Sequence, residues 1–211
     1  MRSEVEAAAV TAGRVTGAPR RARSDAALVR AAQRGSQEAV GALFDRYWDD
    51  AHRAAYWIVH DAAAAEDIAQ EAFLSALRSL DRFDRRRPFG PWLHRIVVNR
   101  AIDHARARAA RSEVSDEALA SHSAADVAPP DRELLAAVAA LPVDQRAVVV
   151  LRYLLGDTPG EIAAALDLPR GTVNSRLRRG LDALREQVDQ GARPPDPPAR
   201  ARHPGRGAGA S

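Results

Sequence analysis

The 211-residue sequence contains no cysteine and no lysine. The absence of cysteine excludes disulfides, thiolate zinc sites and cysteine nucleophiles. The absence of lysine excludes a phosphate-cradling Gly-rich loop that depends on that residue. No apolar run approaches the roughly 18 residues that a membrane span needs. Residues 1–23 also have no continuous apolar stretch of the kind found in a signal peptide. These absences fit a cytoplasmic protein.

All 31 basic residues are arginine, and the formal net charge is only +3. The distribution of charge is therefore more informative than its total. Arginine is concentrated in residues 82–111 and again in residues 170–185, whereas acidic side chains gather in residues 61–71 and 113–126. Two basic and two acidic regions imply at least two kinds of contact surface.

The apolar pattern has helical spacing almost throughout, which predicts an all-α protein. We expect two helical domains joined by a flexible acidic linker. Ser24 and Ser36 are expected to cap the first two helices. The predicted organisation is a disordered tail over 1–23, a first domain over 24–111, a linker over 112–130, a second domain over 131–190 and a disordered tail over 191–211. The helices are expected at 25–34, 37–59, 62–80, 88–109, 132–140, 143–155, 159–166 and 171–188.

Residues 158–188 have the pattern of a helix-turn-helix. Thr158 can cap a helix that begins at Pro159, and Glu161 can reach back to complete a capping box. Pro169 ends that helix because it disfavours helical geometry at the preceding residue. At the turn stands Asp167, a residue type that tolerates left-handed backbone geometry better than most.

The second helix of this motif has an apolar stripe on one side and a polar face on the other. Side chains of the polar kind hydrogen-bond to base edges and phosphates when a helix enters the major groove. The predicted DNA-contacting residues are Asn174, Ser175, Arg178 and Arg179. An ordinary helical hairpin with a solvated basic face is the alternative.

The first domain contains an amphipathic helix over 61–80, followed by an Arg-rich loop over 82–91. Phe83 and Phe89 lie in this loop, where they either stack on unpaired bases beside arginine or pack into the core. Trp92 follows at a position that favours the core.

Three segments together resemble a known family. They are residues 65–74 (AEDIAQEAFL), residues 89–99 (FGPWLHRIVVN), and Leu141-Pro142 followed by the helix-turn-helix. In this order, the segments resemble the extracytoplasmic-function sigma factors. These are small two-domain promoter-recognition subunits of bacterial RNA polymerase.

The resemblance implies a sigma-two-like first domain and a sigma-four-like second domain. By this resemblance the first domain would dock on the β′ clamp of core polymerase through Asp67, Gln70 and Glu71, with Phe73 beside the contact. It would bind the −10 element through Arg85, Arg86, Arg87, Arg95, Asn99 and Arg100, with Asn99 near the flipped base. The second domain would contact the −35 element through its recognition helix. The expected partners are core polymerase (β′ clamp and β subunit), promoter DNA and an anti-sigma factor, with no cofactor and no metal.

Geometry suggests why such a protein needs a partner. DNA elements one and a half to two duplex turns apart lie roughly 50–70 Å from each other. A coil the length of the linker has a relaxed span of roughly 25 Å. An external scaffold must therefore hold the domains at the right spacing, and we expect weak specific DNA binding by the isolated chain.

Three other classes of function fit the sequence less well. An autonomous helix-turn-helix regulator would need a dimerising surface and a sensory domain, and no heptad seam or ligand-pocket pattern is present. An enzyme is disfavoured because none of the six histidines stands in a metal or nucleophile motif. An RNA-binding protein using its Arg-rich tails is disfavoured because alanine and proline dilute those tails.

Overall fold

The computed structural model describes residues 24–114 and 129–191. All regular elements within these ranges are helical, which confirms the all-α prediction. The elements are α2 (Asp25–Ala32), α3 (Gln37–Val59), α4 (Ala62–Ser79), a 3₁₀ turn η1 (Leu80–Arg82), α5 (Phe89–Val114), α6 (Pro129–Ala139), α7 (Val143–Val149), a π-helical turn η2 (Val150–Leu154), α8 (Pro159–Leu166) and α9 (Arg170–Gly191).

The helix bounds agree with the sequence pattern most closely where a cap marks the start. Helices α3 and α8 have the predicted bounds. Helix α5 continues to Val114 and α6 begins at Pro129, so helix enters both ends of the predicted linker. The predicted tails and residues 115–128 lie outside the described residues.

Short polar side chains start the first three helices. Ser24 and Ser36 accept hydrogen bonds from the backbone amides three residues ahead, each at 3.3 Å, as predicted. Asp61 does the same for Ala64 at 3.0 Å. Each bond satisfies an amide that the first turn of a helix leaves without a partner.

Alanine forms much of the contact between α3 and α4 in the core of the first domain. Ala54 and Ala55 on α3 and Ala65, Ala69 and Ala72 on α4 are fully buried. Such small side chains let helix backbones approach closely. Larger apolar groups from α3 and α5 fill the remaining space, with Ile58, Leu93, Val97 and Val98 fully buried.

The second domain packs α7 and η2 against α8 and α9. Its largest fully buried side chains are Val148, Leu151, Ile162 and Val173. Helix α9 passes close to α7 at Gly180, where a Cβ atom would lie 3.0 Å from Cγ2 of Val149. A larger residue at that position would push the two helices apart.

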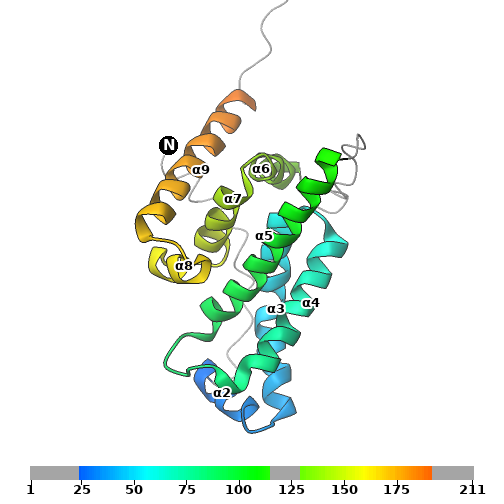
Figure 1. Cartoon of the computed structure of the whole chain (residues 1–211), viewed down its shortest axis with the longest axis vertical. Coiled ribbons are helices and arrows are strands. Elements are labelled where there is room, and N and C mark those ends of the chain that lie inside the picture. The colour runs from blue at the N-terminus through cyan, green and yellow to red at the C-terminus, as the bar shows by residue number, and fades with distance from the viewer. Residues whose placement is uncertain (1–23, 115–128, 192–211) are drawn as a thin grey trace, which may run out of the picture.

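The two domains lie against each other along α5. Figure 1 shows this long helix between α3 and α4 on one side and α7 and α8 on the other, and α5 contacts all four. The apolar core is continuous across the boundary, since Val97 and Val98 belong to the same cluster as Leu151 and Ile162. One face of α5 therefore serves both domains.

Candidate nucleic-acid and protein interfaces

The helix-turn-helix has the local geometry that its sequence predicts. Thr158 Oγ1 accepts from the Glu161 amide at 3.3 Å, and Glu161 Oε2 accepts from the Thr158 amide at 2.8 Å, which completes the capping box. The Thr158 hydroxyl also donates to Glu161 Oε2 at 2.7 Å, and this bond, together with the one from the Thr158 amide, holds the pKa of Glu161 below its usual range. Asp167 ends α8 with a φ of 52°, in the left-handed region.

The outer face of α9 is available to a ligand. Asn174, Arg178 and Arg179 are exposed, as expected for side chains that enter a groove. Ser175 is half-buried, and its hydroxyl donates to the Thr172 carbonyl at 2.9 Å. Arg179 is exposed, but its Nε donates to the Ser175 carbonyl at 3.3 Å, so both Arg179 and Ser175 bond back to their own helix.

Arg170 is a further arginine at this surface. It is exposed at the first position of α9. Its guanidinium lies over Gly160 at the start of α8, where an added Cβ would come within 2.4 Å of Nη2. The sequence places Arg170 in a basic cluster, but only the fold shows that it spans both helices of the motif.

The Arg-rich loop before α5 separates its two kinds of side chain. Arg85, Arg86 and Arg87 are exposed. Phe83 and Phe89 are buried at 7% and 4% exposure and pack against the ring of Trp92, with centroid distances of 4.6 and 5.5 Å. The core alternative therefore holds for both phenylalanines, and the loop offers cations without stacking rings.

The predicted −10 residues on α5 differ in their surroundings. Arg95 is exposed. Arg100 donates to Glu71 Oε2 at 2.7 Å, so a predicted DNA contact and a predicted polymerase contact pair with each other. Asn99 is half-buried, and its Nδ2 donates to the backbone carbonyl of Ala165 in α8 at 3.3 Å.

Helix α4 presents a polar face beside an apolar one. Asp67, Gln70 and Glu71 are exposed, as predicted. Phe73, predicted to lie beside the polymerase contact, is 5% exposed and packs against Phe44, with ring centroids 4.9 Å apart. Leu74, which the sequence reasoning passed over, is 54% exposed instead. The helical spacing of apolar residues did not predict which of Phe73 and Leu74 is buried and which is exposed.

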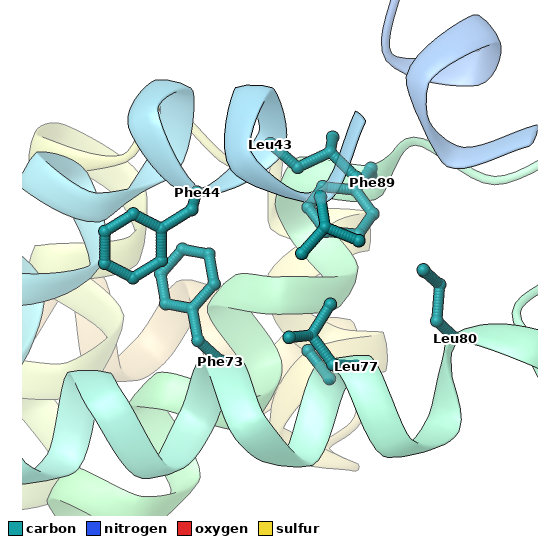
Figure 2. A pocket seen from close by; sticks show the side chains of 8 residues that line it. Leu43, Phe44, Phe73, Leu77, Leu80 and Phe89 are labelled. Carbon is teal, nitrogen blue, oxygen red and sulfur yellow. The ribbon is translucent and has the colours of Figure 1, made fainter. Parts of the chain in front are cut away.

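A shallow apolar recess lies between α3 and α4. Figure 2 shows Leu43, Phe44, Phe73 and Leu77 around it, with Leu80 and Phe89 at one end. Phe44 and Leu77 at its rim are 40% and 39% exposed. Together with Leu74, they make the surface of this domain more apolar than its charge pattern indicates.

One buried polar pair was not foreseen. His94 on α5 and Asp157, just before α8, are 6% and 3% exposed. His94 Nδ1 lies 3.0 and 3.1 Å from the two carboxylate oxygens of Asp157. The residues are 63 positions apart in the chain, so no local sequence signal could have joined them.

The described residues contain neither a metal-binding cluster nor a membrane-spanning helix. Among residues 24–114 and 129–191, no group of three or more His, Cys, Asp or Glu side chains is placed to hold a metal ion. In the same ranges, no helix is long and apolar enough to cross a membrane.

The chain matches two family models in sequence order. Sigma-70 region 2 matches residues 43–111, and Sigma-70 region 4 matches residues 131–184. The order and position of these matches correspond to the two helical domains. The chain is therefore a protein that contains both sigma-70 region 2 and sigma-70 region 4.

Individual relatives narrow the class. The chain is 34% identical to the ECF RNA polymerase sigma factor SigW of Bacillus subtilis, over 76% of this chain and 94% of the relative. It is 33% identical to the ECF RNA polymerase sigma-E factor of Escherichia coli K12, over 78% and 94%. The protein belongs to the ECF sigma factor family.

A solved structure has the same architecture. CnrH, determined in complex with the cytosolic domain of CnrY, is 30% identical with a TM-score of 0.63, covering 80% of this chain and 99% of that one.

Proposed function

We propose that this protein is an alternative sigma factor that binds core bacterial RNA polymerase, recognises −35 and −10 promoter elements and promotes DNA melting. The observation that carries the proposal is the presence of both sigma regions in one chain, with a capped helix-turn-helix whose outer face is exposed. It acts by binding, without catalytic chemistry of its own, in the cytoplasm where the polymerase is found.

For the −35 element, we assign contact to the exposed face of α9. Asn174 supplies donor and acceptor groups for a base edge, and Arg178 and Arg179 supply charge for bases or phosphates. Arg170 extends this face toward α8. Phosphate contacts of this kind give affinity that falls as salt rises.

For the −10 element, we assign strand binding to the loop arginines Arg85, Arg86 and Arg87 and to Arg95, Asn99 and Arg100 on α5. Melting costs about 1.4 kcal/mol of stacking per base-pair step. Capture of an unstacked base near Asn99, with arginines on the strand backbone, would offset part of that cost.

For the polymerase, we assign docking to the exposed face of α4. Asp67, Gln70 and Glu71 supply its polar part, and Leu74 adds apolar area beside them. The relative CnrH was solved with a protein partner. By analogy, we include an anti-sigma protein among the proposed partners.

The experiment is in vitro transcription with core bacterial RNA polymerase on a pool of promoter fragments, with and without this protein. We expect discrete new transcripts that share two upstream elements at a fixed spacing. Absence of initiation, together with specific duplex binding by the protein alone, would instead identify an autonomous helix-turn-helix regulator.

A matched pair of variants sharpens the assignment. Arg178→Ala should lose initiation and reduce the salt dependence of binding, because one phosphate or base contact is gone. Arg185→Ala serves as control, since Arg185 lies on the same helix and pairs with Asp182 at 3.1 Å.

A further inference from the structure

Helix α2 lies before the segment that matches a sigma region. Sigma-70 region 2 matches residues 43–111, whereas α2 covers Asp25–Ala32. The helix nevertheless belongs to the first domain, since Leu28 and Val29 are buried in its core and α2 contacts both α3 and α5. Figure 1 shows α2 at the end of this domain where α5 begins. The family match therefore assigns α2 no role, although the helix is a fixed part of the domain.

Gln33, directly after α2, fixes the helix against the Arg-rich loop. Its side-chain amide donates to the carbonyl of Leu80 at 2.9 Å and to the carbonyl of Phe83 at 3.2 Å. These two carbonyls lie at the start and just past the end of the turn η1, which leads into the loop. The position of α2 relative to the loop is thus set by hydrogen bonds as well as by apolar packing.

The same contact brings two arginines to the edge of the loop. Arg30 lies three positions before Gln33, which keeps helical backbone angles, so both residues lie on one side of the helix. Arg34 follows Gln33 directly, and its amide donates to the Ala31 carbonyl at 3.0 Å. The side chains of Arg30 and Arg34 are both exposed. Two guanidinium groups outside the loop are therefore available beside it.

The loop itself is a hydrogen-bonded turn. The Arg87 amide donates to the Asp84 carbonyl and the Arg86 amide donates to Asp84 Oδ1, each at 3.0 Å. Phe83 and Phe89 are buried at its two ends and anchor it in the core. A turn that is already ordered loses less conformational entropy when its side chains bind a ligand.

Together, α2 and the loop form a basic surface. Residues 25–35 and 80–88 contain six arginines, all exposed, and three aspartates. Asp25 is paired with Arg46 and Tyr47 of α3. Within the described part of the chain, only Arg86 of the six has a carboxylate oxygen within 4.0 Å of its guanidinium, that of Asp84. We call the six the α2–loop surface: Arg30, Arg34, Arg82, Arg85, Arg86 and Arg87.

We propose that Arg30 and Arg34 bind the phosphate backbone of the melted DNA strand and so extend the strand-binding site beyond the loop. The inference rests on the proposed function, because it takes the loop arginines as strand-binding residues. A strand is the expected occupant because the two arginines continue the surface that the loop begins.

Phosphates are the expected contacts on this strand. The α2–loop surface offers guanidinium groups, which pair well with phosphate oxygens, whereas Phe83 and Phe89 are buried and cannot stack on bases. Phosphate contacts position a strand without reading its sequence. Arg30 and Arg34 therefore add affinity, and base recognition is left to other residues.

The test is the salt dependence of binding by the full-length chain to a short randomised single strand of DNA. Arg30→Ala with Arg34→Ala removes two phosphate contacts, and α2 should stay helical because alanine has the highest helix propensity. Each contact with a single strand contributes about 0.7 to the slope of log affinity against log salt, so the slope should become shallower by about 1.4. A rise in salt from about 50 to about 200 mM should then weaken the wild type about sevenfold more than the variant.

Two control variants separate a local contact from a change in total charge. Arg111→Ala with Arg185→Ala also removes two exposed arginines, and it should keep the wild-type slope. Arg185 lies on α9, and the helical rise along α5 places Arg111 roughly 33 Å from Phe89. Arg30→Lys with Arg34→Lys keeps both charges and should also keep the slope.

Two outcomes would overturn the proposal. One is an alanine variant of α2 whose slope equals that of the Arg111 and Arg185 control. The other is a slope that changes on a duplex of the same length but not on the single strand, which would assign α2 to duplex DNA. Transcription by the wild type with core polymerase tests the sigma-factor function separately. Strand binding through α2 without initiation would reject that function alone, and initiation with equal slopes would reject this inference alone.

Discussion

The two helical domains reach stability by different means. In the first domain, α3 and α4 meet through fully buried alanines, and α5 adds large aliphatic groups. In the second, valine, leucine and isoleucine side chains such as Val148, Leu151 and Ile162 fill the interior, and α8 and η2 also pack against α5 and α3. The first domain is joined internally by close contact of alanines, and the second relies in part on contacts with its neighbour.

This difference suggests how each domain suits its proposed role. A rigid platform keeps the exposed face of α4 and the strand-binding face of α5 in fixed register. The second domain shares an apolar core with the first, so the exposed face of α9 is also held in a defined position.

A charge placed in the alanine interface should unfold the first domain. Ala69→Asp buries a carboxylate where no partner exists, which costs about 4–5 kcal/mol of unfolding free energy. The measurement is urea unfolding followed by tryptophan fluorescence. All three tryptophans, Trp48, Trp57 and Trp92, lie in this domain.

The control for that change is Ala63→Asp, at an exposed position in the first turn of the same helix. An acidic residue there interacts favourably with the helix dipole, so stability should be kept. Equal unfolding midpoints for the two variants would contradict the account of the alanine interface.

Loss of Arg146 should weaken both domains together. Arg146→Ala removes the donor to four carbonyls, including that of Ile58 in the first domain, and should cost roughly 2–4 kcal/mol. Burial lowers the pKa of Arg146 to about 10, so the guanidinium stays charged at neutral pH. Tryptophan fluorescence and helical circular dichroism should shift to the same lower midpoint, whereas Arg185→Ala should shift neither.

Loss of the capping box should affect the second domain alone. Thr158→Ala should cost about 1 kcal/mol. Amide hydrogen exchange in α8 should accelerate while exchange in α3 is unchanged. Acceleration in both helices would show that the two domains unfold as one unit.

The same box gives a pH dependence with a defined sign. Hydrogen bonds from Thr158 lower the pKa of Glu161 in the folded state, so the box stabilises the fold above the ordinary glutamate pKa of about 4.3. That stability is lost as the pH falls through the lowered folded-state pKa. The difference between wild type and Thr158→Ala should therefore shrink in acid.

The smallest expected effect is a gain in the stability of the second domain. Asp167 has a φ of 52°, a conformation that costs a residue with a Cβ more than glycine. Asp167→Gly should stabilise the second domain by up to about 0.5 kcal/mol, since added freedom of the unfolded chain offsets part of the benefit. Asp182→Gly, within α9, should instead destabilise it by about 1 kcal/mol. Thermal unfolding of both variants checks the contrast.

Much of the candidate site was predictable because its signals are local. The caps at Ser24, Ser36 and Thr158 depend on residues three positions away, and helical spacing turns Asn174 and Arg178 away from the buried Val173. The exposure of Phe73 and Leu74 was not predictable in this way. Phe73 is buried because it packs against Phe44 of α3, whereas its neighbour Leu74 is exposed. The sequence of α4 alone does not show which of its positions α3 covers.

By itself, the sequence determined the all-α class, the position of the helix-turn-helix and the identity of the polar residues on its outer face. These follow from periodicity and capping over a few residues. Only the tertiary structure decided that Phe83 and Phe89 are core, that Arg100 meets Glu71, and that His94 meets Asp157. Those contacts join residues distant in the chain, and their geometry is set by how whole helices pack.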